Sequence, residues 1–428
     1  MSMLIEFWNK FTGGLMQIVI NPFYYLGIIF IVLQYRKQIQ FERKLFHTRL
    51  HSLLAETWRT LLWGWIGGLI ASILMLFIGT SLSMDTIIIL WVLSFILILF
   101  RVRFFCFAYA AGLLGVLQVF LVPLLKDKVT DGFGLKLLTV LRETDVPSLI
   151  ALVGVLHLLE AFLVARQGTR LSTPLFLEGK RGNVVGGYQM QNFWPVPLFL
   201  LVPFQGDSSV LLPWQPLFGG SLETGWTLLS FPVMIGFAEL TVSRFPRDKT
   251  VWSAKLLALY GTAVLLTAVL AHLWGPLTIV AALLSIALHE GLVWYSRWDE
   301  TQRSPIFVHE RRGLKILAIL PNSPAEEMGL VPGELVHKVN GIRVHTKEGL
   351  HQALRINAAF CKLEVVNLQG EIKFLHRAVF DTDHYQLGIL LSPDQNAMYY
   401  VETTQVTLFA YLGSKLTGLL RNNTGKSA

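Results

Sequence analysis

Long apolar runs recur through the first 300 of the 428 residues of this chain. A helix needs about 20 mostly apolar residues to cross the hydrocarbon core of a bilayer, because its backbone polar groups must be paired internally there. Runs that meet or approach this length lie near residues 16–35, 60–82, 85–100, 104–125, 149–165, 194–213, 224–243, 251–274 and 276–296. We therefore expect an α-helical polytopic membrane bundle of eight or nine helices. The count depends on the run at 194–213, where Pro195, Pro197, Pro203 and Asp207 favour a broken or re-entrant segment.

The composition excludes a conventional soluble protein, since 53% of the residues are hydrophobic and only 15% are charged. The first run continues directly into the basic stretch RKQIQFERK, without a small-residue cleavage site. We therefore expect this run to remain as a membrane helix rather than to be removed as a signal peptide. The formal net charge is +8. Because lysine and arginine cluster at the ends of apolar runs, we assign this charge to membrane orientation and anionic lipid, not to nucleic acid.

Alternate loops between the runs are rich in lysine and arginine, which predicts that these loops face the cytoplasm. The basic segments are 36–59, 101–103, 166–181, 244–249 and 297–312. The last of them leads into the C-terminal region, which is therefore predicted to be cytoplasmic. The loop 126–148 disagrees with this pattern, because it carries four basic residues where the alternation requires an outside loop. These residues are Lys126, Lys128, Lys136 and Arg142. If this loop is inside, the number of crossings is wrong by one.

The sequence changes character near residue 300, and we divide the chain into three parts. These are a polytopic transmembrane domain (1–300), a small α/β domain (304–392) and a C-terminal tail (393–428). Apolar residues of the tail between Val406 and Leu420 fall near helical spacing, which predicts an amphipathic helix that lies on the membrane or against the α/β domain.

Three local signals define the α/β domain. Ser323, followed three residues later by Glu326, has the pattern of a capping box at the start of a short helix. Asn340 and Gly341 lie between two β-like runs, and this residue pair tolerates the positive φ angles of a tight hairpin. Thr346 can cap a second helix. The stretch that carries the first two signals, NSPAEEMGLVPGELVHKVNGIRV, resembles the bacterial form of the PDZ family.

The resemblance to PDZ domains implies a peptide-binding domain that adds an extended ligand strand to the edge of its sheet, beside its longer helix. The carboxylate-binding loop of the family has its closest match in Leu387, Gly388 and Ile389, at the far end of the domain. A permuted strand order could bring this match to the groove. The alternative is an ordinary edge strand with a glycine bulge. On the longer helix, Leu350 and Leu354 are expected to line the groove.

The pair His289-Glu290 is the strongest enzymatic signal, because membrane-embedded zinc proteases carry the motif HExxH. The second histidine position is Val293 here, which leaves a metal short of a ligand. We therefore expect His289 and Glu290 to be a polar pair packed between helices. Cys106 lies in an apolar run and Cys361 near the far end of the chain, in regions expected in the membrane and in water. This separation argues against a disulfide, and nothing in the sequence suggests a thiol-based metal site. The sequence thus predicts no catalytic residue, no metal ligand and no cofactor.

Other polar residues lie inside apolar runs, where a lone charge costs several kcal/mol. Glu160, with His157 one turn earlier, and Glu239 are the clearest cases. We expect structural polar contacts, and the alternative is a transport function with a regulatory PDZ domain. Gly64 and Gly68 form a small-residue face suited to close helix packing.

The whole chain resembles the MinJ family of cell-division topology proteins, in its NPFYY start, its basic QYRKQIQFERK loop, its FWPVPL segment and its terminal PDZ domain. The resemblance implies a membrane scaffold that bridges DivIVA-like and MinD-like division proteins, the latter acting with MinC. It further implies a multi-pass protein of the cell membrane that is enriched at the septum and poles. Self-association stays open. A protease-like protein with a degenerate HExxH motif is the other alternative.

Overall fold

The computed structural model describes residues 2–46, 50–170, 172–179, 182–203, 212–218, 225–357, 359–378, 380 and 387–394. Its α-helices are α1 (Ser2–Ile20), α2 (Pro22–Phe46), α3 (Leu53–Ile78), α4 (Met84–Phe100), α5 (Phe107–Leu125), α6 (Gly132–Glu143), α7 (Val146–Gln167), α8 (Pro246–Leu273), α9 (Thr278–Gln302), α10 (Pro324–Glu327) and α11 (Lys347–Arg355). Two short 3-10 helices are η1 (Val102–Phe105) and η2 (Gly275–Leu277). The strands are β1 (Ser172–Glu178), β2 (Val184–Pro203), β3 (Trp226–Thr241), β4 (Leu314–Ile319), β5 (Leu335–Val339), β6 (Ile342–Arg343), β7 (Phe360–Val366), β8 (Ile372–Ala378) and β9 (Ile389–Leu391). The amphipathic helix expected in the tail lies outside the described residues.

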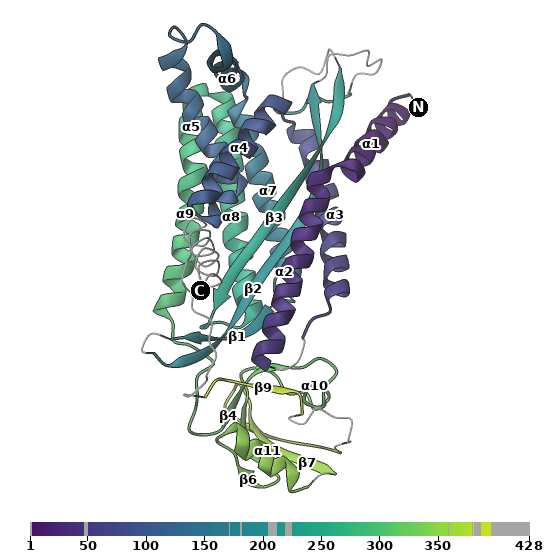
Figure 1. Cartoon of the computed structure of the whole chain (residues 1–428), viewed down its shortest axis with the longest axis vertical. Coiled ribbons are helices and arrows are strands. Elements are labelled where there is room, and N and C mark those ends of the chain that lie inside the picture. Colours follow the sequence, from purple (N-terminus) through teal and green to yellow (C-terminus); the bar gives the residue numbers. More distant parts are fainter. Residues whose placement is uncertain are drawn as a thin grey trace, which may run out of the picture.

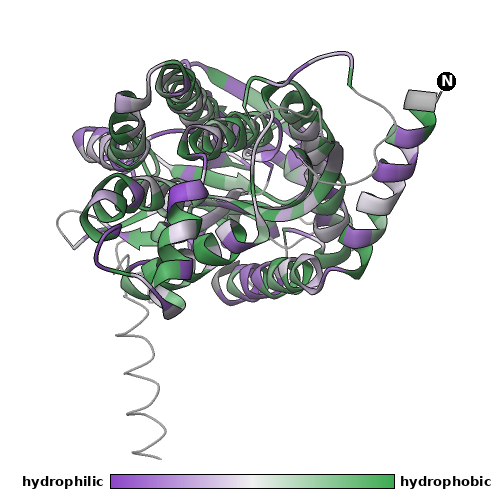
Figure 2. Ribbon diagram, turned by 90° about the horizontal axis from the view of Figure 1, so that it is seen from above, coloured by the Kyte–Doolittle hydropathy of each residue, from purple (hydrophilic) through white to green (hydrophobic). Residues whose placement is uncertain are grey.

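The first part of the chain is a bundle of apolar helices. Within the described residues, five helices are long and apolar enough to cross a membrane, namely α3, α5, α7, α8 and the continuous η2–α9 segment. The bent pair α1 and α2, which meet at 53°, would make a sixth span. Helix α4 is shorter, with 17 residues. Hydrophobic residues predominate in the helices seen from above (Figure 2), and large apolar side chains such as Leu54 and Leu273 face outward. A membrane is the environment in which such a surface is stable.

The runs 194–213 and 224–243, counted above among the possible crossings, are not helices where the structure describes them, because residues 194–203 lie in β2 and residues 226–241 form β3. The two strands pair antiparallel in unbroken register from Tyr188 opposite Thr241 to Pro203 opposite Trp226. Figure 1 shows this long hairpin running diagonally along the helices. Proline in a helix interior costs about 3 kcal/mol or more, so the three prolines of β2 disfavour a helix there.

The free edge of β2 shows why a strand tolerates these prolines. Strand β1 pairs with β2 only as far as Met190, so the later residues face helix α3. Phe199 N donates to Ser72 Oγ of α3 at 2.9 Å, and backbone groups alternate in direction along a strand. The backbone nitrogens of Pro195 and Pro197 therefore lie on this same edge. Since proline has no N–H group, neither leaves a donor unpaired in the apolar interior.

Gly64 and Gly68 allow α3 to lie directly against this edge. A Cβ atom on Gly64 would lie 2.4 Å from the carbonyl oxygen of Pro195, and one on Gly68 would lie 2.2 Å from that of Pro197. Both distances are shorter than any van der Waals contact. The small-residue face predicted from the sequence therefore does serve close packing, but its partner is a strand rather than a helix.

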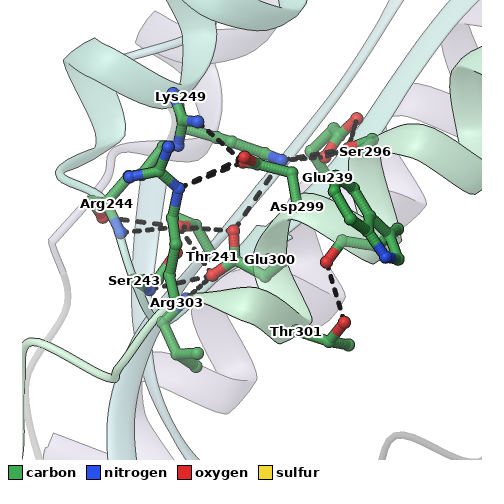
Figure 3. A network of polar contacts seen from close by, with 12 residues as sticks. Glu239, Thr241, Ser243, Arg244, Lys249, Ser296, Asp299, Glu300, Thr301 and Arg303 are labelled. Atoms are coloured by element: carbon green, nitrogen blue, oxygen red, sulfur yellow. Dashed lines mark hydrogen bonds and ion pairs between the residues drawn. The ribbon is translucent and has the colours of Figure 1, made fainter.

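A buried ion network joins β3, α8 and α9 at the end of the hairpin (Figure 3). Lys249 of α8 is fully buried, and its Nζ lies 3.0 Å from Glu239 of β3 and 3.8 Å from Glu300 of α9. Ser296 Oγ lies 3.0 Å from Lys249 Nζ and donates to Glu239 at 2.9 Å. Glu239, whose partner the sequence did not reveal, is thus part of a structural ion network. This finding agrees with the expectation of a structural polar contact.

The C-terminal domain contains a sheet in the order β8-β7-β5-β4-β9, with β6 paired to β5. Ser323 Oγ accepts a hydrogen bond from Glu326 N, and Thr346 Oγ1 accepts one from Gly349 N, so both predicted helix caps are confirmed. The predicted hairpin at Asn340 and Gly341 is also confirmed, because both residues have positive φ angles, of 51° and 84°. The core consists of buried residues from these strands and from α10 and α11.

The C-terminal domain lies at one end of the molecule, and helix α6 lies at the other (Figure 1). Contacts with the membrane part are direct. Gly186 N of β2 donates to Phe307 O at 2.8 Å, and the Tyr188 hydroxyl donates to Leu317 O of β4. Leu50, between α2 and α3, packs against Leu320 and other apolar residues of the domain. The domain is therefore seated on the bundle rather than carried on an extended linker.

Candidate functional site

Strand β9 comes from the far end of the domain and forms an edge of the sheet. It pairs antiparallel with β4, where Ile389 lies opposite Ile319 and Leu390 opposite Ala318. In the described part of the chain, β4 is its only partner strand. The other edge of β9 is therefore free of strand pairing, which is the arrangement required for adding a ligand strand.

The turn before β9 is built by Leu387 and Gly388. Both have positive φ angles, of 55° and 79°, which is unusual for leucine. Their carbonyl oxygens accept hydrogen bonds from Ala325 N at 2.9 Å and from Leu320 N at 2.8 Å. A Cβ atom on Gly388 would lie 2.3 Å from the Cβ of Ser323, so only glycine fits. The structure thus places Gly388 in a tight turn ahead of the strand, and the register shift lies on β4, between Ile316 and Ala318.

The predicted groove residues of α11 and β9 meet in one apolar cluster. Leu350, Leu387 and Ile389 are buried together in the core of the domain, and the partly buried Leu354 packs against the same core. The cluster can provide an apolar floor beside the free edge of β9. On the opposite face of the sheet, Leu390 packs with Leu50 of the membrane part. The domain therefore contacts the bundle through this face and leaves the face with Leu350 and Leu354 for a ligand.

The polar residues that the sequence placed inside the bundle lie close together. The Tyr109 hydroxyl lies 2.9 Å from His289 Nδ1 and donates to Glu290 at 2.7 Å. Arg103 forms an ion pair with Glu290 at 2.9 Å. His289 and Glu290 are therefore polar residues packed between helices, as expected. Neither the HExxH spacing nor any second histidine on α9 is present within the described residues, because position 293 is valine.

Cys106 is the residue of this region that sequence reasoning missed. It precedes α5, and its Sγ lies 3.3 Å from His157 Nε2 of α7. Cys106, His157 and His289 bring one ligand-type atom each within 4.8 Å of one another. No spacing motif could have revealed this group, since its members are 51 residues and more apart. The other cysteine, Cys361, is free and buried in the C-terminal domain, where burial raises the pKa of its thiol to about 11.

Comparison with known proteins agrees with the geometry. The model of the PDZ domain family matches residues 315–367. The "Cell division topological determinant MinJ" of Bacillus subtilis (strain 168) is 30% identical over 386 residues, which cover 88% of this chain and 93% of that protein. The "Probable cell division topological determinant MinJ" of Lacticaseibacillus paracasei is 26% identical over 271 residues, or 60% of this chain and 69% of its own length. The protein of the same name from Lacticaseibacillus casei (strain BD-II) has the same identity and coverage.

No solved structure is detectably similar to this chain. The relatives are named as division determinants and not as enzymes. The extent of the first match includes both the apolar bundle and the PDZ domain. This chain therefore belongs to the MinJ family of cell-division topological determinants.

Proposed function

We propose that this chain is a membrane-anchored scaffold of division-site placement, which bridges a DivIVA-like protein at poles and septum to a MinD-like protein and its partner MinC. The names of its relatives support the division role, and the family resemblance supplies the two partners. In this proposal the output is contact rather than chemistry. Confinement to the membrane raises the local concentration of each partner, so modest affinities suffice.

The observation that carries the proposal is the free edge of β9, positioned beside the apolar residues of α11 and fixed at one end of the bundle. We assign peptide binding to Leu387, Gly388 and Ile389 together with Leu350 and Leu354. A partner segment would pair with β9 through main-chain hydrogen bonds and place one apolar side chain against Leu354. The basic segments next to the PDZ domain support a cytoplasmic position for it, where both partners are available.

Localisation of a fluorescent fusion tests this function. We expect enrichment at septum and poles that is lost when the DivIVA-like protein is deleted, and a MinD-like protein that disperses when this chain is deleted. The variant Leu354→Asp should reduce the recruitment of one partner while the chain stays in the membrane. Phe374→Asp is the matched control, because Phe374 is 70% exposed on β8, at the opposite edge of the sheet. An even distribution around the cell, unchanged by either deletion, would contradict the proposal.

A further inference from the structure

We propose that Cys106, His157 and His289 bind a zinc ion within the membrane domain, and that Glu160 completes its coordination. The residues lie on different elements of the bundle, with Cys106 at the start of α5, His157 and Glu160 on α7, and His289 on α9. The ion would join three helices that have no covalent link near this point. Thiolate and imidazole ligands are the set that zinc prefers in proteins.

Three of the four proposed ligand atoms lie close to the spacing that a tetrahedral ion requires. Bond lengths of about 2.0–2.3 Å place the ligand atoms of a tetrahedral zinc site roughly 3.3–3.8 Å apart. His157 Nε2 lies 3.3 Å from Cys106 Sγ and 3.9 Å from Glu160 Oε2. The ligand atoms of Cys106, His157 and His289 all lie within 4.8 Å of one another. Glu160 lies outside this group of three, so its carboxylate would have to turn toward Cys106 and His289 to complete the coordination.

The hydrogen bonds of both histidines orient their rings for metal binding. His157 Nδ1 lies 2.8 Å from Val153 O, and because a carbonyl oxygen can only accept, the proton must be on Nδ1. The lone pair of His157 Nε2 is then free to accept from the Cys106 thiol, 3.3 Å away, or to bind an ion. His289 Nδ1 lies 2.9 Å from the Tyr109 hydroxyl, which leaves Nε2 of His289 for the ion. Metal-binding histidines are commonly held in this way through their second nitrogen.

The charges also favour a divalent cation. The side chain of Glu160 is largely buried in an apolar run, with 14% of its surface exposed. Its carboxylate lies 3.9 Å from the unprotonated Nε2 of His157, which supplies no positive charge to it. A zinc ion with one thiolate and one carboxylate ligand forms a site with no net charge. Such a site has the lowest free energy of burial in a medium of low dielectric constant.

An aromatic side chain packs against both histidine rings. The Tyr260 ring lies edge-on to His157, with 4.7 Å between ring centroids, and to His289, with 5.5 Å. Tyr260 is buried, and its hydroxyl donates to Ser285 O of α9. The site differs from the HExxH arrangement, since its second histidine comes from α7 and its thiol from α5. We assign the ion a structural role, which is to fix α5 and α9 against α7.

The full-length protein, purified in detergent from cells grown with added zinc, tests the proposal by elemental analysis. We expect about one zinc ion per chain after dialysis against a weak chelator. Protein produced with Co²⁺ in place of zinc should show the visible absorption of a tetrahedral ion and a near-ultraviolet band from thiolate-to-cobalt charge transfer. The charge-transfer band reports the thiolate itself, so it separates binding at Cys106 from binding at surface histidines.

Variants identify the ligands. Cys106→Ser should abolish the charge-transfer band, and His157→Gln and His289→Gln should each reduce the zinc content several-fold. Cys361→Ser and His272→Gln are the matched controls and should keep both signals, because these residues lie away from the cluster. Size-exclusion profiles identify any variant that has lost its fold, and Cys106→Ser, nearly equal in volume, should keep the profile of the parent protein.

Two results would overturn the proposal. One is a well-folded parent protein that holds far less than stoichiometric zinc and shows no charge-transfer band with Co²⁺, since Cys106 and His157 would then form only a thiol–imidazole hydrogen bond. The other is a zinc content that survives Cys106→Ser and His157→Gln but falls in a control variant, because the ion would then be bound elsewhere. Division-site localisation is measured separately, so a failure of the zinc proposal leaves the scaffold function standing.

Discussion

Lys249 carries a charge in a fully buried position, and its two carboxylate partners come from different elements. Removal of one member of a buried ion network leaves the others uncompensated, which costs about 3–5 kcal/mol. We expect Lys249→Met to lower the unfolding temperature in detergent strongly, and Lys249→Met with Glu239→Gln to recover part of the loss. Lys255→Met, exposed on the same helix, is the matched control and should change little. Equal losses for both lysines would contradict a role for the network.

His51 gives the protein a stability that depends on pH. Burial alone would lower the pKa of His51, but the hydrogen bond and charge of the buried Glu42, 2.6 Å away, outweigh it and raise the pKa above 6.5. The protonated form is therefore favoured by folding. Its contribution is fully present below about pH 6.5, the unfolded value, and is lost as the pH rises through the raised folded value.

The measurement is the unfolding temperature in detergent between about pH 6 and about pH 9. We expect this temperature to fall with rising pH, and the fall to be smaller in His51→Gln. His345→Gln, exposed in the PDZ domain, should keep the pH dependence of the parent protein. An unchanged pH profile in His51→Gln would show that the pair with Glu42 contributes nothing.

At the scale of elements, the packing of α3 on β2 depends on two glycines, Gly64 and Gly68, which have no side chain to keep helix and strand apart. Alanine at position 68 would bring a Cβ atom to 2.2 Å from the carbonyl oxygen of Pro197, so helix and strand must separate. Such overpacking costs about 1–3 kcal/mol. On α1, Gly13 has no atom within 4 Å of the corresponding position, and alanine there should stabilise the helix by up to about 1 kcal/mol. Opposite shifts in unfolding temperature for Gly68→Ala and Gly13→Ala are therefore expected, and shifts of equal sign would contradict this packing.

The same elements show what the sequence could predict. Helix caps at Ser323 and Thr346 and the hairpin at Asn340 were readable, because each depends on a few adjacent residues. The run of β3 was interpreted as a helix and that of β2 as a broken or re-entrant segment, since a fully buried strand and a buried helix are both continuous apolar runs. The prolines of β2 contained the missing information, but their meaning depends on which strand edge faces α3.

The peptide-binding edge and the Cys106 cluster also differ in how far the sequence could predict them. The turn at Leu387 and Gly388 could be proposed from a family resemblance, and the structure places it beside an edge strand. The contact of Cys106 with His157 and His289 could not be predicted, because it depends on how three helices pack. The sequence indicated only that Cys106 lies in the membrane part and Cys361 in the C-terminal domain. That separation is no obstacle to a site in which only Cys106 takes part.

At the scale of the whole molecule, the seating of the PDZ domain couples it to the bundle. Phe307 is buried between Phe245 and Tyr188, with ring centroids 5.8 Å and 5.5 Å away. These contacts hold the domain, and with it β9, against the end of the bundle, which limits the directions from which a partner can approach. A scaffold that bridges two proteins benefits from such rigidity, since less entropy is lost when the second partner binds.

The positions of α6 and the PDZ domain predict the orientation of the chain. They lie at opposite ends of the molecule (Figure 1), so we expect the loop 126–148 and the PDZ domain to be exposed on opposite sides of the membrane. Since the PDZ domain is expected inside, the four basic residues of that loop are expected outside, against the usual charge preference. Cysteines introduced at Lys128 and Arg343, both exposed, can be labelled with a membrane-impermeant maleimide in intact cells. We expect labelling at position 128 and none at position 343 until the cells are opened; labelling at both positions in intact cells would contradict this orientation and would remove the PDZ domain from the compartment of its proposed partners.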